Sequence, residues 1–343
     1  MSAEPAVIWH QPVMGPEVLR SLNPRPGAMI VDGTVGTGGH SLMLLPHILP
    51  TGRLVAIDRD REALQLARKR LTEFEPQVTF VREDFRHLVT VLKDLGLSRV
   101  DGLLLDLGMS SLHVERAERG FSFSHEGPLD MRMDLEQDAT AEALVNELSA
   151  DELALIFETF GEERLAKRIA TCLVKARRVR RLTTTTQLAR LVLEATPPAA
   201  RHGRIHPATR VFQALRMAVN DELGALQTVL ASLRDLLTPG GRAVILTFHS
   251  LEDRLVKQTF AQGMHDGSWT VLTKKPLRPS QEEVAANPRA RSAKLRAVER
   301  VGSGRDRVTG PGASSTPRRR RWRTGWPRTA SEPRRKRKMW SSA

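Results

Sequence analysis

Residues 32–41 read DGTVGTGGHS and directly follow the apolar segment Ala28–Asp32, which we expect to be a strand. Glycines at a strand-to-helix turn let the backbone approach a ligand closely, and the helix that follows offers free N–H groups to polar or anionic atoms. A glycine cluster by itself is a weak signal, because some such turns are only tight connections. The segments that follow therefore have to show whether this turn binds a ligand or is only a tight connection.

Two common nucleotide-binding patterns do not fit this turn. A phosphate-binding loop needs a Lys followed by Ser or Thr, whereas Gly38 is followed by Gly39 and His40. The dinucleotide pattern fails because Ser41 stands where its third glycine is required. We therefore expect neither a nucleotide triphosphatase nor the dinucleotide fingerprint.

Short apolar segments alternate with amphipathic ones up to about residue 110. Strands are expected over Arg53–Asp58, Val78–Arg82 and Val100–Asp106, and a helix over Glu62–Thr72, where apolar residues have helical spacing. This order is typical of βαβ units, so it predicts an α/β fold with a parallel sheet.

Helical signals replace this pattern from about His113 to Arg204. Ser149 with Glu152, and Thr184 with Gln187, form capping boxes in front of apolar helical stretches. These signals predict an all-helical insert.

Strand signals return after the insert. Pro207 is expected to begin one long helix to about Leu237, and the Pro-Gly-Gly sequence at 239–241 to end it. Strands are then expected over Arg242–Phe248, Trp269–Thr273 and Leu295–Val301. We predict two parts of one α/β domain at 1–112 and 206–300, a helical insert at 113–205 that we expect to recognise RNA, and a tail at 301–343.

The formal net charge of +14 is unevenly distributed. Residues 301–343 carry +11 and the other 300 residues only +3. This basic C-terminal tail is rich in Pro, Ser, Gly and Arg without hydrophobic periodicity, so we expect it to be disordered. Its arginines are interleaved with Trp322, Trp326 and Trp340, which suits RNA binding by phosphate contacts and stacking, although a merely solvated extension fits equally well.

The cysteine and histidine content indicates the cellular compartment and limits the kinds of metal site that the chain could form. The single Cys172 excludes an intramolecular disulfide and a multi-cysteine metal site, which indicates a reducing compartment. We expect a cytoplasmic protein, because neither a secretion signal nor an apolar run of membrane-spanning length is encoded. His202 and His206 have helical spacing, but Gly203 and Pro207 argue against one helix carrying both, so we expect no metal.

Acidic residues close the expected strands. Asp58 ends the second strand, where a carboxylate accepts hydrogen bonds from ribose hydroxyls. Asp84 ends the third strand beside Phe85, a candidate face for adenine, and Asp106 ends the fourth. Ligands of open α/β sheets bind at the carboxyl ends of the strands, so these residues should line one crevice with Gly38. A nucleoside without phosphates, S-adenosylmethionine, is the ligand this set favours.

Longer segments between residues 10 and 300 are more specific. They include LLLDLGMSS from Leu103, ERGFSF from Glu118, GPLDMRMD from Gly127, HPATRVFQALRMAVNDEL from His206 and GGRAVILTFHSLEDRLVK from Gly240. Through these segments and the glycine turn, the chain resembles the RsmH family, also called MraW. Members of that family methylate the exocyclic N4 amine of a cytidine in the decoding region of bacterial 16S ribosomal RNA.

The resemblance implies a fold, a cofactor and a binding site. The fold is a Rossmann-like class I methyltransferase sheet interrupted by the helical insert, and the cofactor is S-adenosylmethionine. His113 stands where the family usually has Gln, a departure that replaces an amide with an imidazole. The implied cofactor-binding residues are Gly38, Gly39, His40, Asp58, Phe85, Asp106 and His113.

Methyl transfer to a cytosine amine needs help from the protein, because the amine shares its lone pair with the ring. A hydrogen-bond acceptor would orient the amine and stabilise the positive charge that develops on it. Asp106 is the first candidate for this catalytic role, followed by His249 and Asn220. Asp130 and Arg132 either contact the substrate or form an ion pair that braces the insert.

The resemblance implies that the partner is 16S rRNA within the small ribosomal subunit. We expect no membrane association, and a homodimer is possible. The basic run from Lys175 to Arg181 is a candidate RNA clamp. One alternative function is that of a non-catalytic ribosome-assembly factor, which binds RNA and keeps a vestigial cofactor pocket. A small-molecule methyltransferase is the third hypothesis, after these two. The intact glycine turn and strand-end carboxylates favour the enzyme.

Overall fold

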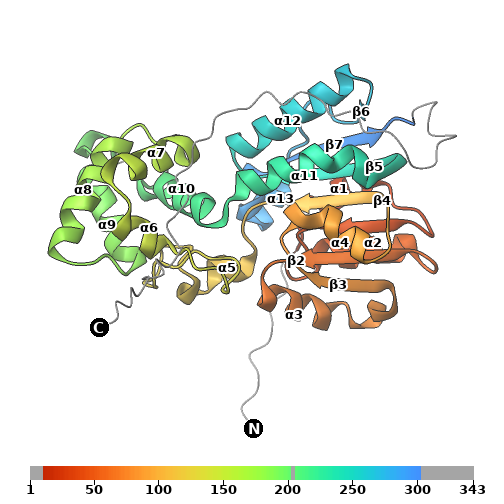
Figure 1. Ribbon diagram of the computed structural model, residues 1–343, viewed down its shortest axis with the longest axis horizontal. Coiled ribbons are helices and arrows are strands. Elements are labelled where there is room, and N and C mark those ends of the chain that lie inside the picture. The colour runs from red at the N-terminus through yellow and green to blue at the C-terminus, as the bar shows by residue number, and fades with distance from the viewer. Residues whose placement is uncertain (1–10, 202–204, 303–343) are drawn as a thin grey trace, which may run out of the picture. The chain divides into compact units, whose positions relative to one another are not determined.

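A seven-stranded sheet forms the frame of the molecule (Figure 1). The computed structural model describes residues 11–201 and 205–302, which belong to one compact unit. The strand order is β3-β2-β1-β4-β5-β7-β6. The strands are β1 Met29–Asp32, β2 Arg53–Asp58, β3 Val78–Arg82, β4 Val100–Asp106, β5 Leu237–Thr247, β6 Trp269–Val271 and β7 Lys294–Arg300.

The sheet is mixed. Strands β1 to β5 pair in parallel, which confirms the parallel order expected from the first half of the chain. Strand β7 then runs antiparallel between β5 and β6. Because β1 to β5 are parallel, their carboxyl ends meet at one edge, where ligands of such sheets bind.

Helices cover both faces of the sheet. One face packs on α1 Gly15–Leu22, α2 Gly39–Ile48 and α3 Arg61–Arg70, and the other on α4 Leu88–Asp94, α11 Glu222–Leu236 and α12 Ser250–His265. Within β4, Leu104 faces the first group, while Leu103 and Leu105 face the second. This alternation follows from the two-residue period of a strand. Each fully buried Leu contributes about 1.5–3 kcal/mol to the free energy of unfolding.

The chain between β4 and α11 forms a second hydrophobic core. In the described part of this stretch the elements are helical: α5 Ser111–Glu115, α6 Ala141–Glu147, α7 Ala150–Gly161, α8 Ala166–Val179, α9 Thr185–Ala195 and α10 Ala208–Asn220. Both predicted capping boxes are present, at Ser149 before α7 and at Thr184 before α9. The core joins residues of α6 to α10 around the fully buried Phe157. In Figure 1, α6 to α9 lie together, apart from the strands.

The prediction of one long helix from Pro207 to Leu237 is wrong. The chain breaks at Asp221, which adopts the left-handed conformation with φ 46° and separates α10 from α11. Helix α10 packs into the helical core and α11 onto the sheet, so one straight helix cannot serve both. The Pro-Gly-Gly sequence at 239–241 does not end the helix either. Strand β5 already begins at Leu237, so these three residues lie within the strand.

The remaining expectations about organisation are not settled by these elements. The four-part division of the chain stays a prediction. The basic tail lies outside the described residues except for its first two positions. Within the described ranges, no helix combines the length and the apolar character needed to cross a membrane.

Candidate active site

Asp58 connects the glycine-rich turn to the second strand. Its Oδ2 accepts a hydrogen bond from the Gly36 N–H at 2.9 Å, and its Oδ1 accepts one from the Asp60 N–H at 2.9 Å. Gly36 adopts a φ of +52° and Gly38 a φ of +82°, a conformation that favours glycine. Burial raises the pKa of Asp58, although the two N–H groups partly oppose this effect.

A crevice opens at the carboxyl ends of the parallel strands. Six of the predicted cofactor residues line it: Gly39, His40, Asp58, Phe85, Asp106 and His113. The other one, Gly38, precedes α2 as its N-cap and packs against Leu71. The strand-end carboxylates and the glycine turn therefore meet in one place.

Asp106 lies at the end of β4 on the wall of this crevice. Its Oδ1 is buried and has no hydrogen-bond partner among the described residues, and its Oδ2 lies 3.6 Å from Nδ1 of His40. Burial, together with the negative charge of Glu252, raises the pKa of Asp106 to about 7. At neutral pH this carboxyl group therefore divides between its ionised and protonated forms.

His40 presents an unprotonated nitrogen to Asp106. Its Nε2 lies 2.9 Å from the carbonyl oxygen of Val13, which can only accept, so Nε2 carries the hydrogen. Burial lowers the pKa of His40, which favours the neutral ring. Nδ1 then carries no hydrogen, and at 3.6 Å from Oδ2 of Asp106 it lies beyond hydrogen-bond distance.

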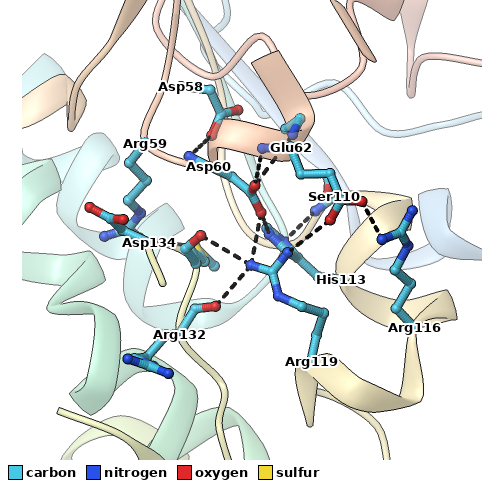
Figure 2. A network of polar contacts seen from close by, with 12 residues as sticks. Asp58, Arg59, Asp60, Glu62, Ser110, His113, Arg116, Arg119, Arg132 and Asp134 are labelled. Atoms are coloured by element: carbon cyan, nitrogen blue, oxygen red, sulfur yellow. Dashed lines mark hydrogen bonds and ion pairs between the residues drawn. The ribbon is translucent and has the colours of Figure 1, made fainter. Parts of the chain in front are cut away.

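His113 uses both ring nitrogens within the protein. Its Nε2 lies 2.8 Å from Oδ2 of Asp60, and its Nδ1 accepts a hydrogen bond from the Ser110 N–H at 3.3 Å (Figure 2). The ring is stacked on Phe121 with a centroid separation of 4.8 Å. A ring nitrogen could contact a ligand only if one of these hydrogen bonds broke, so the predicted cofactor contact is left to the carbon edge of the ring.

Asp60 is the centre of the network in Figure 2. Its Oδ1 caps α3, and its Oδ2 receives hydrogen bonds from His113 and from Arg119 at 2.8 Å. Arg119 also donates to the carbonyl oxygens of Arg132 and Met133 in the insert. Burial alone would raise the pKa of Asp60, but His113 and Arg119 outweigh it and lower the pKa to about 2.

Charged residues of the insert brace this region. Asp130 and Arg132 form an ion pair, with 2.8 Å between Oδ2 and Nη2. This is one of the two roles expected for them, the other being substrate contact. Arg132 also donates to the carbonyl oxygen of Gln137 at 2.7 Å. Asp134 pairs with Arg82 of β3 at 2.6 Å. These contacts give the charged residues of GPLDMRMD a structural role.

Asn220 does not face the crevice, which argues against its predicted catalytic role. Its Oδ1 accepts from the Met133 N–H, and its amide donates to the carbonyl oxygens of Met131 and Arg216. The side chain is 2% exposed, and these contacts use both amide hydrogens. Asn220 therefore fastens the end of α10 to the insert.

His249 is also absent from the crevice wall. Its ring caps α12, with Nδ1 accepting from the Glu252 N–H at 3.4 Å, and its Nε2 lies 3.0 Å from Oε1 of Glu252. It is Glu252, with Glu222 and Phe248, that lines the crevice. His249 therefore contacts Glu252, although its Nε2 forms no hydrogen bond among the described residues, and its side chain does not line the crevice where its predicted catalytic role would place it.

Sequence reasoning missed these three wall residues, although a signal for Glu252 was present. Glu252, Val256 and Phe260 are spaced by four and share the buried face of α12. A carboxylate at an apolar position of a helix is rarely buried without a role. The neighbouring Asp253 instead pairs with Lys294 and Arg296 of β7.

Comparisons with known proteins give a consistent result. The profile of the family described as "MraW methylase family" matches residues 7–301. The chain is 46% identical over 312 residues to a ribosomal RNA small subunit methyltransferase H of Symbiobacterium thermophilum, covering 87% of this chain and 98% of that one. It is 48% identical over 310 residues to the protein of the same name from Syntrophotalea carbinolica, covering 86% and 99%.

A solved structure of a SAM-dependent O-methyltransferase from Thermotoga maritima is a more distant match. It is 12% identical, with a TM-score of 0.39, and covers 86% of this chain and 68% of that chain. A match this weak adds nothing to the two relatives above.

The network around Asp60 predicts an acid-dependent loss of stability. Asp60→Asn keeps the shape but removes the charge that faces Arg119 and His113, so we expect the free energy of unfolding at pH 7 to fall by about 2–3 kcal/mol. The pKa of Asp60 is lower in the folded state, so its contribution is present above pH 4 and is lost as the pH falls toward 2. Denaturant unfolding at pH 7 and pH 3 should show the difference between the two proteins shrinking to about half. An equal difference at both pH values would contradict this account.

Proposed function

The chain belongs to the MraW methylase family, and on this premise we propose that it transfers a methyl group from S-adenosylmethionine to the exocyclic N4 amine of a cytidine in the decoding region of 16S ribosomal RNA. The observation that carries the proposal is Asp106, with a buried, unpartnered Oδ1 in the crevice bounded by the glycine turn and Asp58. The substrate is the RNA of the small ribosomal subunit, and we expect the protein to act in the cytoplasm.

The residues of the crevice fit S-adenosylmethionine. Each oxygen of Asp58 accepts one backbone N–H and so keeps a lone pair for a ribose hydroxyl. Phe85 lines the same crevice and offers a face to adenine. The turn at 32–41 contains no Lys or Arg, as suits a ligand without phosphates. When bound, this cofactor supplies an electrophilic methyl group on a cationic sulfonium.

Asp106 would hold the reacting amine. Its ionised carboxylate accepts a hydrogen bond from the amine and stabilises the positive charge that develops on N4, whereas the protonated form carries no charge. Its pKa of about 7 places this change within the physiological range.

The exposed C-terminal end of α8 and the residue that follows it suit an RNA backbone. Lys175, Arg178 and Arg180 are exposed, whereas Arg177 donates to a backbone carbonyl and Arg181 pairs with a glutamate of α6. Three cations of the basic run are therefore left for phosphate contacts. A single-stranded or irregular RNA segment bound there lets a base leave its stack at little cost.

Mapping methylated cytidines tests the proposal as a whole. Small-subunit RNA from cells with and without the gene is digested and analysed by mass spectrometry. We expect one N4-methylated cytidine to be absent without the gene and restored by the wild-type chain. Identical RNA from both cells would refute the methyltransferase and leave an RNA-binding factor.

The role of Asp106 predicts a pH-dependent rate. At low cofactor concentration the single-turnover rate should rise between pH 6 and 8, because ionised Asp106 becomes more populated as the pH passes about 7. Asp106→Asn should lower the rate by about 10²-fold and flatten this dependence. Calorimetry gives the affinity for S-adenosylmethionine in parallel. A rate restored by excess cofactor would mean that Asp106 only holds the cofactor.

The three exposed cations at the C-terminal end of α8 predict a change in salt dependence. Replacing Lys175, Arg178 and Arg180 together by Gln should reduce the slope of log affinity against log salt by about 2–3, since each phosphate contact contributes about 0.7–0.9. Binding of small-subunit RNA is measured at several salt concentrations. Arg234→Gln, an exposed position of α11, is the matched control. An unchanged slope in the triple variant would place the RNA elsewhere.

A further inference from the structure

A second buried carboxylate faces the crevice beside Asp106. Glu252, in the first turn of α12, is 2% exposed and lines the crevice. Its Oε2 accepts a hydrogen bond from the Phe248 N–H at 2.9 Å, at the end of β5. Strands β4 and β5 are neighbours, and Asp106 is in register with Leu246. The two carboxylates therefore flank the carboxyl ends of adjacent strands.

The surroundings of Glu252 keep it ionised. Burial by itself would raise the pKa of Glu252, but His249, the positive charge of Arg216 and the Phe248 N–H together hold the pKa below its usual value. Arg216 also forms an ion pair with Glu222, through contacts of 2.7 and 2.9 Å. The positive charge of Arg216 is therefore shared between Glu222 and Glu252, and Glu252 remains a negatively charged group of the crevice wall.

An aromatic side chain completes this side of the crevice. Phe248 lines it, and a Cβ at Gly108 would lie 3.5 Å from Cδ2 of the Phe248 ring, so the ring lies against the chain that follows Asp106. A flat base can stack on such a ring while its edge meets the carboxylates. The wall thus combines a stacking surface with two acceptors.

We propose that Glu252 is a catalytic residue that accepts one hydrogen of the target amine while Asp106 accepts the other. This inference rests on the proposed function and adds a residue and a rule of base selection to it. With both hydrogens held, the plane of the amine is fixed and its electron pair points out of that plane toward the methyl group. His249 is a positioning residue, because it touches Glu252 and not the base.

The bonds and charges balance in this arrangement. As the bond between N4 and the methyl carbon forms, the bond from that carbon to sulfur breaks and its electron pair leaves with sulfur. N4 then carries the positive charge that the sulfonium has lost. One N4 proton passes to the Glu252 carboxylate and from there to solvent, which leaves a neutral methylated base.

The same pair of acceptors selects cytosine against uracil. Cytosine presents an amine with two hydrogens to this wall, whereas uracil presents a carbonyl oxygen at the same position. While Asp106 and Glu252 are both ionised, neither can donate a hydrogen bond to that oxygen, and two buried acceptors would be left unpaired, which a binding site rejects strongly. In these ionisation states the wall therefore disfavours uridine.

The test compares Glu252→Gln with Asp253→Asn. Both remove one negative charge from the first turn of α12, but Asp253 pairs with Lys294 and Arg296, away from the crevice. Single-turnover methylation of small subunits that lack the modification is measured at saturating cofactor, together with calorimetric cofactor affinity and thermal unfolding. We expect Glu252→Gln to slow methylation by about 10²-fold with cofactor affinity within about threefold of wild type, and Asp253→Asn to keep the rate.

Base selection gives a second measurement. RNA oligonucleotides that carry cytidine or uridine at the methylated position compete for the protein in the presence of S-adenosylhomocysteine. We expect wild type to prefer cytidine by at least about tenfold and Glu252→Gln to lose most of that preference, because the amide can donate to the uracil oxygen. A merely structural role for Glu252 would leave this ratio unchanged.

The outcomes separate the two proposals. If wild type does not methylate small subunits, the proposed function fails; if wild type methylates and Glu252→Gln is equally fast, only the present inference fails. Should Glu252→Gln not fold, Glu252→Asp keeps the charge and withdraws the oxygens by one methylene. A normal rate in that folded variant would also overturn the role of Glu252.

Discussion

The buried carboxylate of Asp60 is the constraint on which the rest of the site depends. It accepts hydrogen bonds from two buried side chains, His113 and Arg119, and so joins the crevice wall to the insert. Its backbone N–H holds Asp58, so the residue that faces the crevice and the residue that anchors the insert are two positions apart.

Two aspartates of this site, Asp60 at the N-cap of α3 and Asp106 at the end of β4, show how the environment gives one residue type two different properties. Asp60 is surrounded by donors and its pKa falls to about 2, whereas Asp106 has an unpartnered oxygen and a carboxylate neighbour and its pKa rises to about 7. The first is a fixed charge that maintains structure. The second gains most from a positive charge brought by a ligand, which is the property that methyl transfer from a sulfonium requires.

The strands and the crevice could be predicted from the sequence because their signals are local. Strands β2, β3 and β4 have the predicted bounds, and the topology of parallel strands then places Asp58 and Asp106 at one edge. The break at Asp221 could not be predicted, because helical periodicity continues across it and only the packing of two separate cores interrupts it. Asn220 and His249 were assigned by residue type, which does not say whether a side chain faces a ligand or the protein interior. Glu252 was overlooked because its residue type alone does not show that it shares the buried face of α12 with Val256 and Phe260.

The junction at Asp221 has a mechanical consequence. Helix α10 belongs to the helical core and α11 to the sheet, and one residue connects them, with Arg216 clasping Glu222 across the joint through two contacts. Glu222 also lines the crevice. A large RNA that moves the insert would therefore also move Glu222 through this ion pair. The position of the bound substrate and the shape of the crevice thus depend on each other.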